Sequence, residues 1–419
     1  MRPAGPSPAA PPHEHGYRWA MLGGVWLIYF GFGLLSVAMA PLVDPISRDL
    51  GLSYTTMGAI LGAWPLVYIV AAAPCGAFVD RVGLKWSLFL AVLVIAASGG
   101  LRAVAFDAAT LFVAVGLFGI GGPLISIGAP KAIAQWFQGA ERGLAMGVYI
   151  TGPALGNMLA LMLTNSVLMP LTGGNWRQVL LIYAGFILAT GLAWFLLGSH
   201  PINRVVERAG RRRETVAGQL AVFARLLRLP NIQVILAISI GAFFFHHALS
   251  NWLPEILRTG GMAPDVAGIW SAAPTAIGIV GALLIPRLAT PSRRFTILFG
   301  LSLCGGAGAL MLLVAGTPAL VVAMILQGIG RGSLIAVLIL VLMETRGVDP
   351  RNTGAAVGLF FSAAEIGGVL GPLAIGAASD LTGGFDAGLW LLGAVSAAVV
   401  GLLCLHRGIE RRDKAAHSI

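Results

Sequence analysis

Two charged residues stand inside long apolar stretches of the sequence, where a charge is costly. Arg331 and Glu365 each lie near the middle of an apolar run long enough to cross a membrane. A guanidinium presents a fork of N–H groups that matches a carboxylate or another oxyanion, and a carboxyl group could take up and release a proton. The two residues therefore predict an anion-binding site with a proton-coupling acid, a structural ion pair that binds no solute, or a substrate anion that competes with Glu365 for Arg331.

Polar and aromatic side chains recur at helical spacing in the run that begins near Asn231. One stripe carries Ser239, Phe243, His246 and Ser250, and the neighbouring stripe carries His247 and Asn251. Adjacent residues of a helix point about 100° apart, so we expect at most one of the two histidines to face a central cavity. That histidine could bind a solute or relay a proton near neutral pH, and packing between helices is an equal alternative.

Composition indicates which elements hold these residues. The chain has 419 residues, of which 57% are hydrophobic and 11% charged, whereas a soluble domain is about a quarter charged. Lipid must therefore be its main solvent, and a water-soluble protein is excluded. Apolar runs of the ~20 residues that a spanning helix needs begin near Arg18, Tyr54, Trp86, Ala108, Gly143 and Arg177, and again near Asn231, Pro264, Phe295, Pro318, Thr353 and Ala387. The sequence predicts twelve transmembrane helices.

The basic residues predict the orientation. Of the 27 Lys and Arg residues, 22 lie in the tails and in alternate loops, and only Arg48, Arg102, Arg177 and Arg258 lie on the other side. The positive-inside rule places both termini in the cytoplasm, as in a multi-pass protein of a bacterial-type inner membrane. The net charge of +10 does not indicate a nucleic-acid partner, because no basic stripe is interleaved with aromatic residues. We expect these charges to face the lipid bilayer.

The two halves of the chain repeat each other. When the sequence is shifted by about 210 residues, the stretches that begin at Gly51 and Gly119 overlay those that begin at Gly261 and Gly328, and Gly143, Gly147 and Gly156 match Gly354, Gly358 and Gly367. We therefore expect an all-α membrane protein with twelve transmembrane helices in two pseudo-symmetric six-helix bundles.

The same reasoning predicts five segments. Residues 1–17 are expected to form a disordered cytoplasmic tail, 18–198 the N-terminal bundle, 199–230 a basic cytoplasmic loop, 231–406 the C-terminal bundle and 407–419 a second cytoplasmic tail.

A loop between the second and third apolar runs carries a family signature. Gly76-Ala-Phe-Val-Asp80-Arg81-Val-Gly83-Leu84-Lys85 resembles the G-x-x-x-D-R-x-G-R-R/K motif of the major facilitator superfamily, with Leu84 as a departure. The resemblance implies that Asp80 and Arg81, with Gly76 and Gly83 in the same motif, form cytoplasmic contacts that help hold one bundle against the other in the outward-facing state. Ordinary positive-inside loop charge is the alternative.

The second copy of this loop, Pro286 to Arg294, lacks the Asp and Gly of the motif. Within the superfamily, the stretch from Asn251 to Leu257 and the following Gly261 to Gly268 resemble the cyanate and nitroimidazole permease branch.

The resemblance also implies that spans one, four, seven and ten line a central cavity. The substrate-binding candidates are then Arg331, Gln327, His246, His247, Asn251, Tyr29 and Phe32, together with Tyr149 and Asn157 of span five, and Glu365 is the candidate for proton coupling. Each uncharged candidate is also a common packing residue.

These observations predict a monomeric secondary active transporter that moves a small solute, most simply a small organic or inorganic anion, by alternating access with protons or a counter-substrate. An exporter of neutral or apolar compounds is the alternative, because Gly152-Pro153 with Gly156 distantly resembles an antiporter motif of the family. An integral-membrane enzyme or receptor is disfavoured, since the sequence offers neither a catalytic constellation nor a large soluble segment.

No cofactor or metal is expected. The chain has no GxxxxGK[ST] nucleotide motif, and its three cysteines are isolated and have no metal-binding spacing. His13 and His15 are expected to lie in a solvated tail.

Overall fold

The computed structural model describes residues 16–203, 206, 216–345, 347–348 and 352–415, and its regular secondary structure is helical. In the first half the helices are α1 (Arg18–Ser36), η2 (Ala40–Leu42), α2 (Val43–Leu50), α3 (Tyr54–Leu61), α4 (Ala63–Val82), α5 (Leu84–Ala103), α6 (Ala108–Trp136), α7 (Gly139–Leu163), η3 (Thr164–Leu168), α8 (Met169–Leu171) and α9 (Trp176–Gly198).

The central segment contains α11 (Val216–Leu226). The second half contains α12 (Pro230–Thr259), α13 (Pro264–Leu288), α14 (Arg294–Leu310), η4 (Met311–Leu313), α15 (Thr317–Glu344), α16 (Thr353–Thr382) and α17 (Asp386–Ala415). Within the described residues, 12 helical segments are long and apolar enough to cross a membrane, and they begin within a few residues of the predicted starts. The prediction of twelve spanning helices is confirmed.

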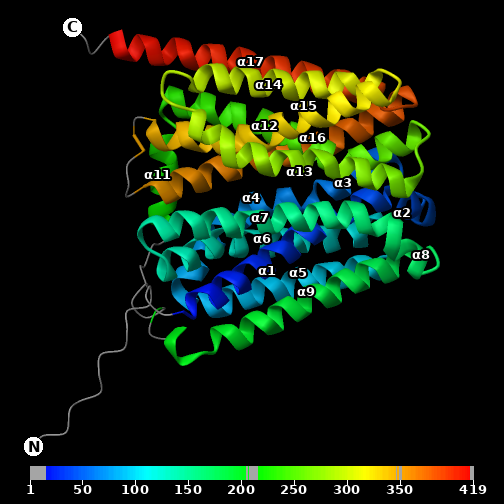
Figure 1. Cartoon of the computed structure of the whole chain (residues 1–419), viewed down its shortest axis with the longest axis horizontal. Coiled ribbons are helices and arrows are strands. Elements are labelled where there is room, and N and C mark those ends of the chain that lie inside the picture. The colour runs from blue at the N-terminus through cyan, green and yellow to red at the C-terminus, as the bar shows by residue number, and fades with distance from the viewer. Residues whose placement is uncertain (1–15, 204–205, 207–215, 346, 349–351, 416–419) are drawn as a thin grey trace, which may run out of the picture.

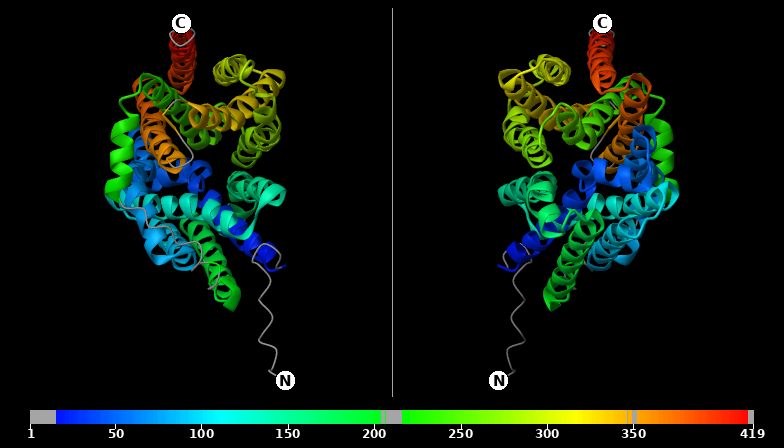
Figure 2. Two further views of the ribbon diagram at one scale, coloured as in Figure 1. Left: turned by 90° about the vertical axis from the view of Figure 1, so that its left-hand side faces the viewer. Right: turned by 90° about the vertical axis from the view of Figure 1, so that its right-hand side faces the viewer.

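The helices form two bundles that lie side by side (Figure 1). The first bundle (the N-terminal half) comprises α1 to α9 and the second (the C-terminal half) comprises α12 to α17, with the helix axes roughly parallel in both. Helix α1 begins and α17 ends at the same end of the molecule, which we call the terminal end. Figure 2 views the same two bundles along the helices.

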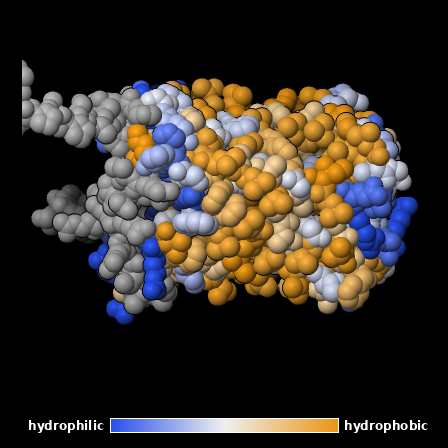
Figure 3. Space-filling model, turned by 90° about the horizontal axis from the view of Figure 1, so that it is seen from below, coloured by the Kyte–Doolittle hydropathy of each residue, from blue (hydrophilic) through white to orange (hydrophobic). Residues whose placement is uncertain are grey.

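The surface agrees with a lipid environment. Large apolar side chains such as Val70, Val113, Leu196 and Trp390 are exposed on the spanning helices. In the space-filling view, hydrophobic residues form a broad belt, and hydrophilic residues gather toward the two ends (Figure 3). Lipid tails cover such a belt, whereas the backbone polar groups are satisfied inside the helices.

Glycines at repeated positions set the close approach of helices in both halves. A methyl group at Gly119 would collide with the Trp64 carbonyl, and one at Gly328 would approach the Pro274 carbonyl. In the same way Gly156 lies against the Phe30 backbone, and Gly367 lies against the backbone of Ile240. These two glycine matches are therefore matching helix–helix contacts, which small residues permit, whereas Gly143, Gly147 and Gly354 have no atom within 4 Å of an added methyl group.

The two halves meet through α3 and α4 against α16, and through α7 against α13. Gly58 faces the Pro372 backbone, and Gly268 faces the Leu161 backbone, so these contacts also repeat. All four residues lie toward the end of the molecule opposite to the terminal end, which we call the far end.

The boundaries of the predicted tails and loop differ from the structure. The central segment is not all loop, because α11 packs against both α16 and α4. Helix α17 continues past residue 406 to Ala415. Tyr17, expected in the tail, donates its hydroxyl to the Leu197 carbonyl at 2.8 Å and stacks on His200. His13, His15 and the run of arginines at 211–213 lie outside the described residues.

Arg102, which was counted on the side opposite to the termini, lies in the last turn of α5 and is buried there. Its side chain is 2% exposed, donates from Nη1 to the Leu35 carbonyl at 3.1 Å and lies over the Phe118 ring. The physical reason is the early end of α1 at Ser36, which leaves carbonyl groups without helical partners. A cation at a helix C-terminus satisfies such a carbonyl and the helix dipole together.

Candidate functional site

Arg331 lies at the middle of α15 and reaches across to α12. One guanidinium nitrogen, Nη2, donates to the Ser250 hydroxyl and to the His246 carbonyl, the latter at 3.2 Å. Nε has no hydrogen-bond partner, and no ion pair of Arg331 is found among the described residues. Arg331, His246 and Ser250 are all partly exposed although they lie midway along their helices. The guanidinium is therefore a nearly unpaired cation that faces an interior space.

Glu365 takes another partner. Its Oε2 lies 3.4 Å from Nε2 of His247, and both side chains are buried. The two atoms are not aligned for a hydrogen bond, and Oε2 remains without one. The predicted ion pair between Arg331 and Glu365 is not formed in this structure. The reason is helix geometry, because the Ser250 side chain, which accepts from Arg331, and the His247 side chain, which faces Glu365, point to different sides of α12.

The two histidines have different surroundings. His246 is partly exposed, and its Nδ1 has no hydrogen-bond partner. His247 is buried between Glu365 and the ring of Trp64, whose centroid is 5.2 Å away. Trp64 belongs to the N-terminal half, so the contact joins the two halves at the depth of the charges.

Aromatic rings continue from this contact through the N-terminal half. Trp64 lies edge-on to Phe32 at 6.4 Å, Phe32 lies 5.6 Å from Tyr29, and Tyr29 stacks on Tyr149 at 5.6 Å. On the other side of His247, the ring of Phe243 lies 5.6 Å away and contacts Phe361. We call this run of rings, Tyr149, Tyr29, Phe32, Trp64, His247, Phe243 and Phe361, the aromatic band.

Three predicted pocket residues do not join the site. Gln327 donates from Nε2 to the Gly308 carbonyl on α14, so it faces away from the other half. Asn251 donates to the His247 carbonyl of its own helix at 2.8 Å. Asn157 is hydrogen-bonded to Ser36 at 2.9 Å, where α7 packs on α1. Helical spacing identified these amides but did not show which way each helix is turned.

The sequence did not single out Trp64 or Phe118, which packs on Phe32 at 5.0 Å. Both are aromatic residues inside predicted spans, and that is a weak signal because rings are common in spans. Trp64 also lies in span two, which the family resemblance did not assign to the cavity.

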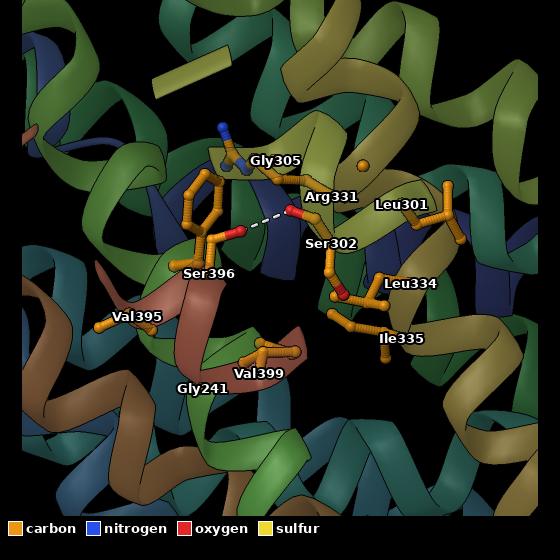
Figure 4. A pocket seen from close by; sticks show the side chains of 13 residues that line it. Gly241, Leu301, Ser302, Gly305, Arg331, Leu334, Ile335, Val395, Ser396 and Val399 are labelled. Atoms are coloured by element: carbon orange, nitrogen blue, oxygen red, sulfur yellow. Dashed lines mark hydrogen bonds between the residues drawn. The ribbon is translucent and has the colours of Figure 1, made fainter. Parts of the chain in front are cut away.

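A pocket opens beside Arg331 within the C-terminal half, between α12, α14, α15 and α17. Its walls are largely apolar, with Leu334, Ile335, Val395 and Val399 around it. Ser396 donates to the Ser302 carbonyl at 2.6 Å, and the nitrogen atoms of Arg331 lie away from Leu334 and Ile335 (Figure 4). An apolar pocket thus lies next to the side chain that carries the guanidinium.

Comparison with known families decides the class of protein. The model described as Major Facilitator Superfamily matches residues 21–343 and 248–418. The chain belongs to the major facilitator superfamily. It is therefore a multi-pass membrane transporter of a small molecule and not an enzyme. The branch suggested by residues 251–268 stays a prediction.

Relatives within the superfamily include several transporters. The chain is 25% identical over 399 residues to a hexuronate transporter of Bacillus subtilis, covering 90% of both chains. It is 26% identical over 381 residues to a probable nitrate/nitrite transporter of Mycobacterium tuberculosis, covering 88% of this chain and 91% of the relative. A galacturonate transporter of Dickeya chrysanthemi is 27% identical over 216 residues, which cover 49% of this chain and 59% of the relative.

The superfamily signature lies at the terminal end. Asp80 forms an ion pair with Lys131 at 2.5 Å, and both residues belong to the N-terminal half. Gly83 ends α4 with φ of 99°, a conformation that suits glycine, Gly76 is buried within α4, and Arg81 is exposed. In this structure Asp80 makes no described contact between the halves, so its gating role stays a prediction for another state.

Polar contacts between the halves are found at the far end. Asp380 of α16 accepts from the backbone N–H groups of Tyr54 and Thr55 at 3.0 and 2.7 Å, at the N-terminus of α3. Arg258 pairs with Asp44 at 3.0 Å. No local sequence pattern indicated these partners, because Tyr54 and Asp380 are 326 positions apart.

The Tyr54 hydroxyl also donates to Glu255 at 2.7 Å, and Glu255 is in turn paired with Arg258. By contrast, the ion pairs described at the terminal end, Arg18 with Glu141 and Arg294 with Glu344, each stay within one half. The halves are therefore held together at the far end.

Proposed function

We propose that this chain is a secondary active transporter of small organic or inorganic anions, and that Arg331 binds the anion. The observation that carries this proposal is the guanidinium at mid-depth, which is partly exposed and has a hydroxyl and a carbonyl but no carboxylate among its described partners. An isolated charge away from water is expensive, and an opposite charge lowers that cost strongly where the dielectric constant is low. The transported anion is the counter-charge that this site lacks.

The relatives support the same substrate class. Hexuronate, galacturonate and nitrate are all anions, and the three relatives are named for transporting them. An exporter of neutral or apolar compounds would gain nothing from a guanidinium at mid-depth without a carboxylate partner, so this arrangement supports the anion carrier over that alternative.

We further propose that the terminal end faces the cytoplasm, as the distribution of Lys and Arg residues indicates, in a bacterial-type inner membrane. The far end is then external. Because the polar contacts between the halves lie there, this structure corresponds to an inward-facing state of a single chain. In the outward-facing state, Asp80 and Arg81 are expected to form contacts between the halves at the cytoplasmic end.

Glu365 is the proposed proton-coupling group. It is buried at the same depth as the anion site, and His247 at 3.4 Å gives it a neighbour that can share a proton. Protonation of this pair would change the local charge next to Arg331. Such coupling lets a proton gradient or a counter-substrate drive the anion, without a nucleotide.

Exchange in proteoliposomes tests the proposal. Vesicles loaded with nitrate, acetate, benzoate or glucuronate would receive purified protein, and uptake of the same labelled anion would be followed. We expect at least one anion to exchange, Arg331→Ala to abolish exchange and Arg287→Ala, at an exposed arginine, to retain it. Equal exchange by Arg331→Ala and the unaltered protein would refute the role of Arg331.

A further inference from the structure

We propose that the transported anion is an aryl monocarboxylate, a carboxylate attached to a planar aromatic body, and that the aromatic band with the apolar pocket beside Arg331 receives that body. The inference rests on the proposed function, because it takes Arg331 as the group that binds the carboxylate. It goes further by choosing among the anions that a guanidinium could hold.

Arg331 contacts α12 at His246, and aromatic rings lie around the side chain of that residue. His246, whose carbonyl accepts from Arg331, lies 6.3 Å from Phe243 and 5.4 Å from His247, and His247 lies 5.2 Å from Trp64. On the other side, the pocket of Figure 4 offers Leu334 and Ile335. A ligand held by its carboxylate at this guanidinium would place its body against apolar surface.

The band also has a geometry that suits a flat body. Its contacts combine offset stacking with edge-on packing, for example 13° between the rings of Tyr29 and Tyr149 and 86° between those of Phe32 and Trp64. Aromatic pairs prefer these arrangements and gain attraction beyond the burial of area. An added ring can therefore extend the band in either manner.

Three amide side chains that could bind the hydroxyl groups of a sugar are already hydrogen-bonded within the protein. A hexuronate carries several hydroxyl groups, each of which needs a hydrogen-bond partner when it leaves water. The side-chain nitrogens of Gln327 and Asn251 are committed to carbonyls within the C-terminal half, and Asn157 is committed to Ser36.

Within the described part of the chain, the hydroxyls of Tyr29 and Tyr149 are the groups of the band that have accessible oxygen atoms and no hydrogen bond. These hydroxyls suit a polar substituent at the distal edge of a ring. An aryl substrate would differ from that of the hexuronate transporter, to which the chain is similar over 90% of its length.

Direct binding to the purified full chain tests the inference. The panel is benzoate, its saturated analogue cyclohexanecarboxylate, glucuronate and nitrate, with neutral benzamide as a charge control, each measured by calorimetry at one salt concentration. We expect benzoate to bind at least tenfold more tightly than glucuronate and several-fold more tightly than cyclohexanecarboxylate, with benzamide not bound.

Variants connect the preference to the band. Trp64→Leu is expected to remove the advantage of benzoate over cyclohexanecarboxylate, and Trp64→Phe to keep most of it. Phe186→Leu, at a partly exposed ring outside the band, is the matched control and should change neither affinity. If Trp64→Leu does not fold, the comparison of Trp64→Phe with the control still measures the contribution of the indole.

The possible outcomes separate the two proposals. Failure of benzoate to bind overturns the aryl inference, whichever other anion binds. If glucuronate or nitrate binds instead and its binding depends on Arg331, the proposed anion carrier is supported and the proposed aromatic substrate is refuted. Binding of benzamide equal to that of benzoate, or benzoate binding that is unchanged in Arg331→Ala, overturns the proposed function itself.

Discussion

The N-terminal and C-terminal halves have the same helical plan, yet they bring opposite chemistry to the space between them. The N-terminal half contributes rings, namely Tyr29, Phe32, Trp64 and Tyr149, and the C-terminal half contributes the ionisable groups Arg331, Glu365, His246 and His247. One half would thus hold the charge of a substrate while the other contacts its body. A substrate that needs both halves favours the states in which they close around it, which is what alternating access requires.

The repeat explains why the halves could diverge in this way. The contacts of Gly156 with Phe30 and of Gly367 with Ile240 occupy equivalent places and fix how closely the helices pack. Side chains that do not take part in these contacts are free to differ. The shared glycines therefore determine how the helices pack, and we propose that the unshared charges and rings determine the function.

The largest expected effect comes from replacing Arg331, which tests whether the C-terminal half holds the charge of the substrate. Arg331→Ala removes the charge and should weaken anion binding by about 30-fold or more, the range expected when one partner of a buried charge pair is lost. Arg331→Lys keeps the charge without the planar fork and should lose about tenfold. Calorimetric titration with the best-bound anion measures both. Near-normal affinity in Arg331→Ala would show that the C-terminal half does not hold the charge.

The glycine contacts test whether the two halves are packed alike. Gly156→Ala and Gly367→Ala should each destabilise the protein by about 1–3 kcal/mol, because the added methyl group meets backbone. Gly185→Ala, which has no atom within 4 Å of its added methyl group, is the control and should change stability by less than about 0.5 kcal/mol. Thermal unfolding in detergent measures all three. If only one of the two paired glycine sites tolerates the change, the two halves are not packed alike.

Glu365→Gln tests whether, within the C-terminal half, anion binding and proton coupling belong to different residues. The amide mimics the protonated acid, so anion exchange should persist while accumulation driven by a pH gradient falls by about tenfold or more. Glu344→Gln, at an exposed carboxylate paired with Arg294, is the matched control. Proton-driven accumulation that survives in Glu365→Gln would assign coupling to another group.

A smaller effect concerns the ends at which the halves meet. Asp380→Asn weakens the charge-assisted contact with the N-terminus of α3, worth about 1–3 kcal/mol, and should shift the protein toward the outward-facing state. A cysteine at Leu161, buried where α7 meets α13, would report the shift through labelling by an impermeant thiol reagent. Asp80→Asn should shift labelling in the opposite direction. Equal labelling in both variants would contradict the assignment of the two gates.

The sequence predicted the fold because lipid imposes a simple rule. A spanning helix needs an apolar run of fixed length, and twelve such runs with matched glycines specify two bundles. The depth of Arg331 and Glu365 in the membrane was predicted by counting residues along the same apolar runs. Their partners were not predicted, because Ser250 and His247 point to different sides of α12 in a way that depends on how that helix is rotated.

Helix rotation also explains the residues that were predicted wrongly or missed. Gln327 lies four residues from Arg331 on α15, yet it bonds to Gly308 of the neighbouring α14. Trp64 lies in a span that was not expected to line the site, and it reaches the other half because Pro65 and Gly368 bring α4 and α16 close. Contacts between residues far apart in the sequence carry no local pattern.

The central claim is that the charge of Arg331 is balanced by the transported anion and not by Glu365. A double-mutant cycle of Arg331→Ala, Glu365→Ala and the double variant, measured by thermal unfolding without substrate and by anion titration, tests it most directly. We predict that Arg331→Ala leaves the melting temperature unchanged or raised, that coupling between the two sites is below about 1 kcal/mol, and that the double variant folds but does not bind the anion. A strongly destabilised Arg331→Ala that is rescued by Glu365→Ala, with anion binding retained in the double variant, would contradict the claim.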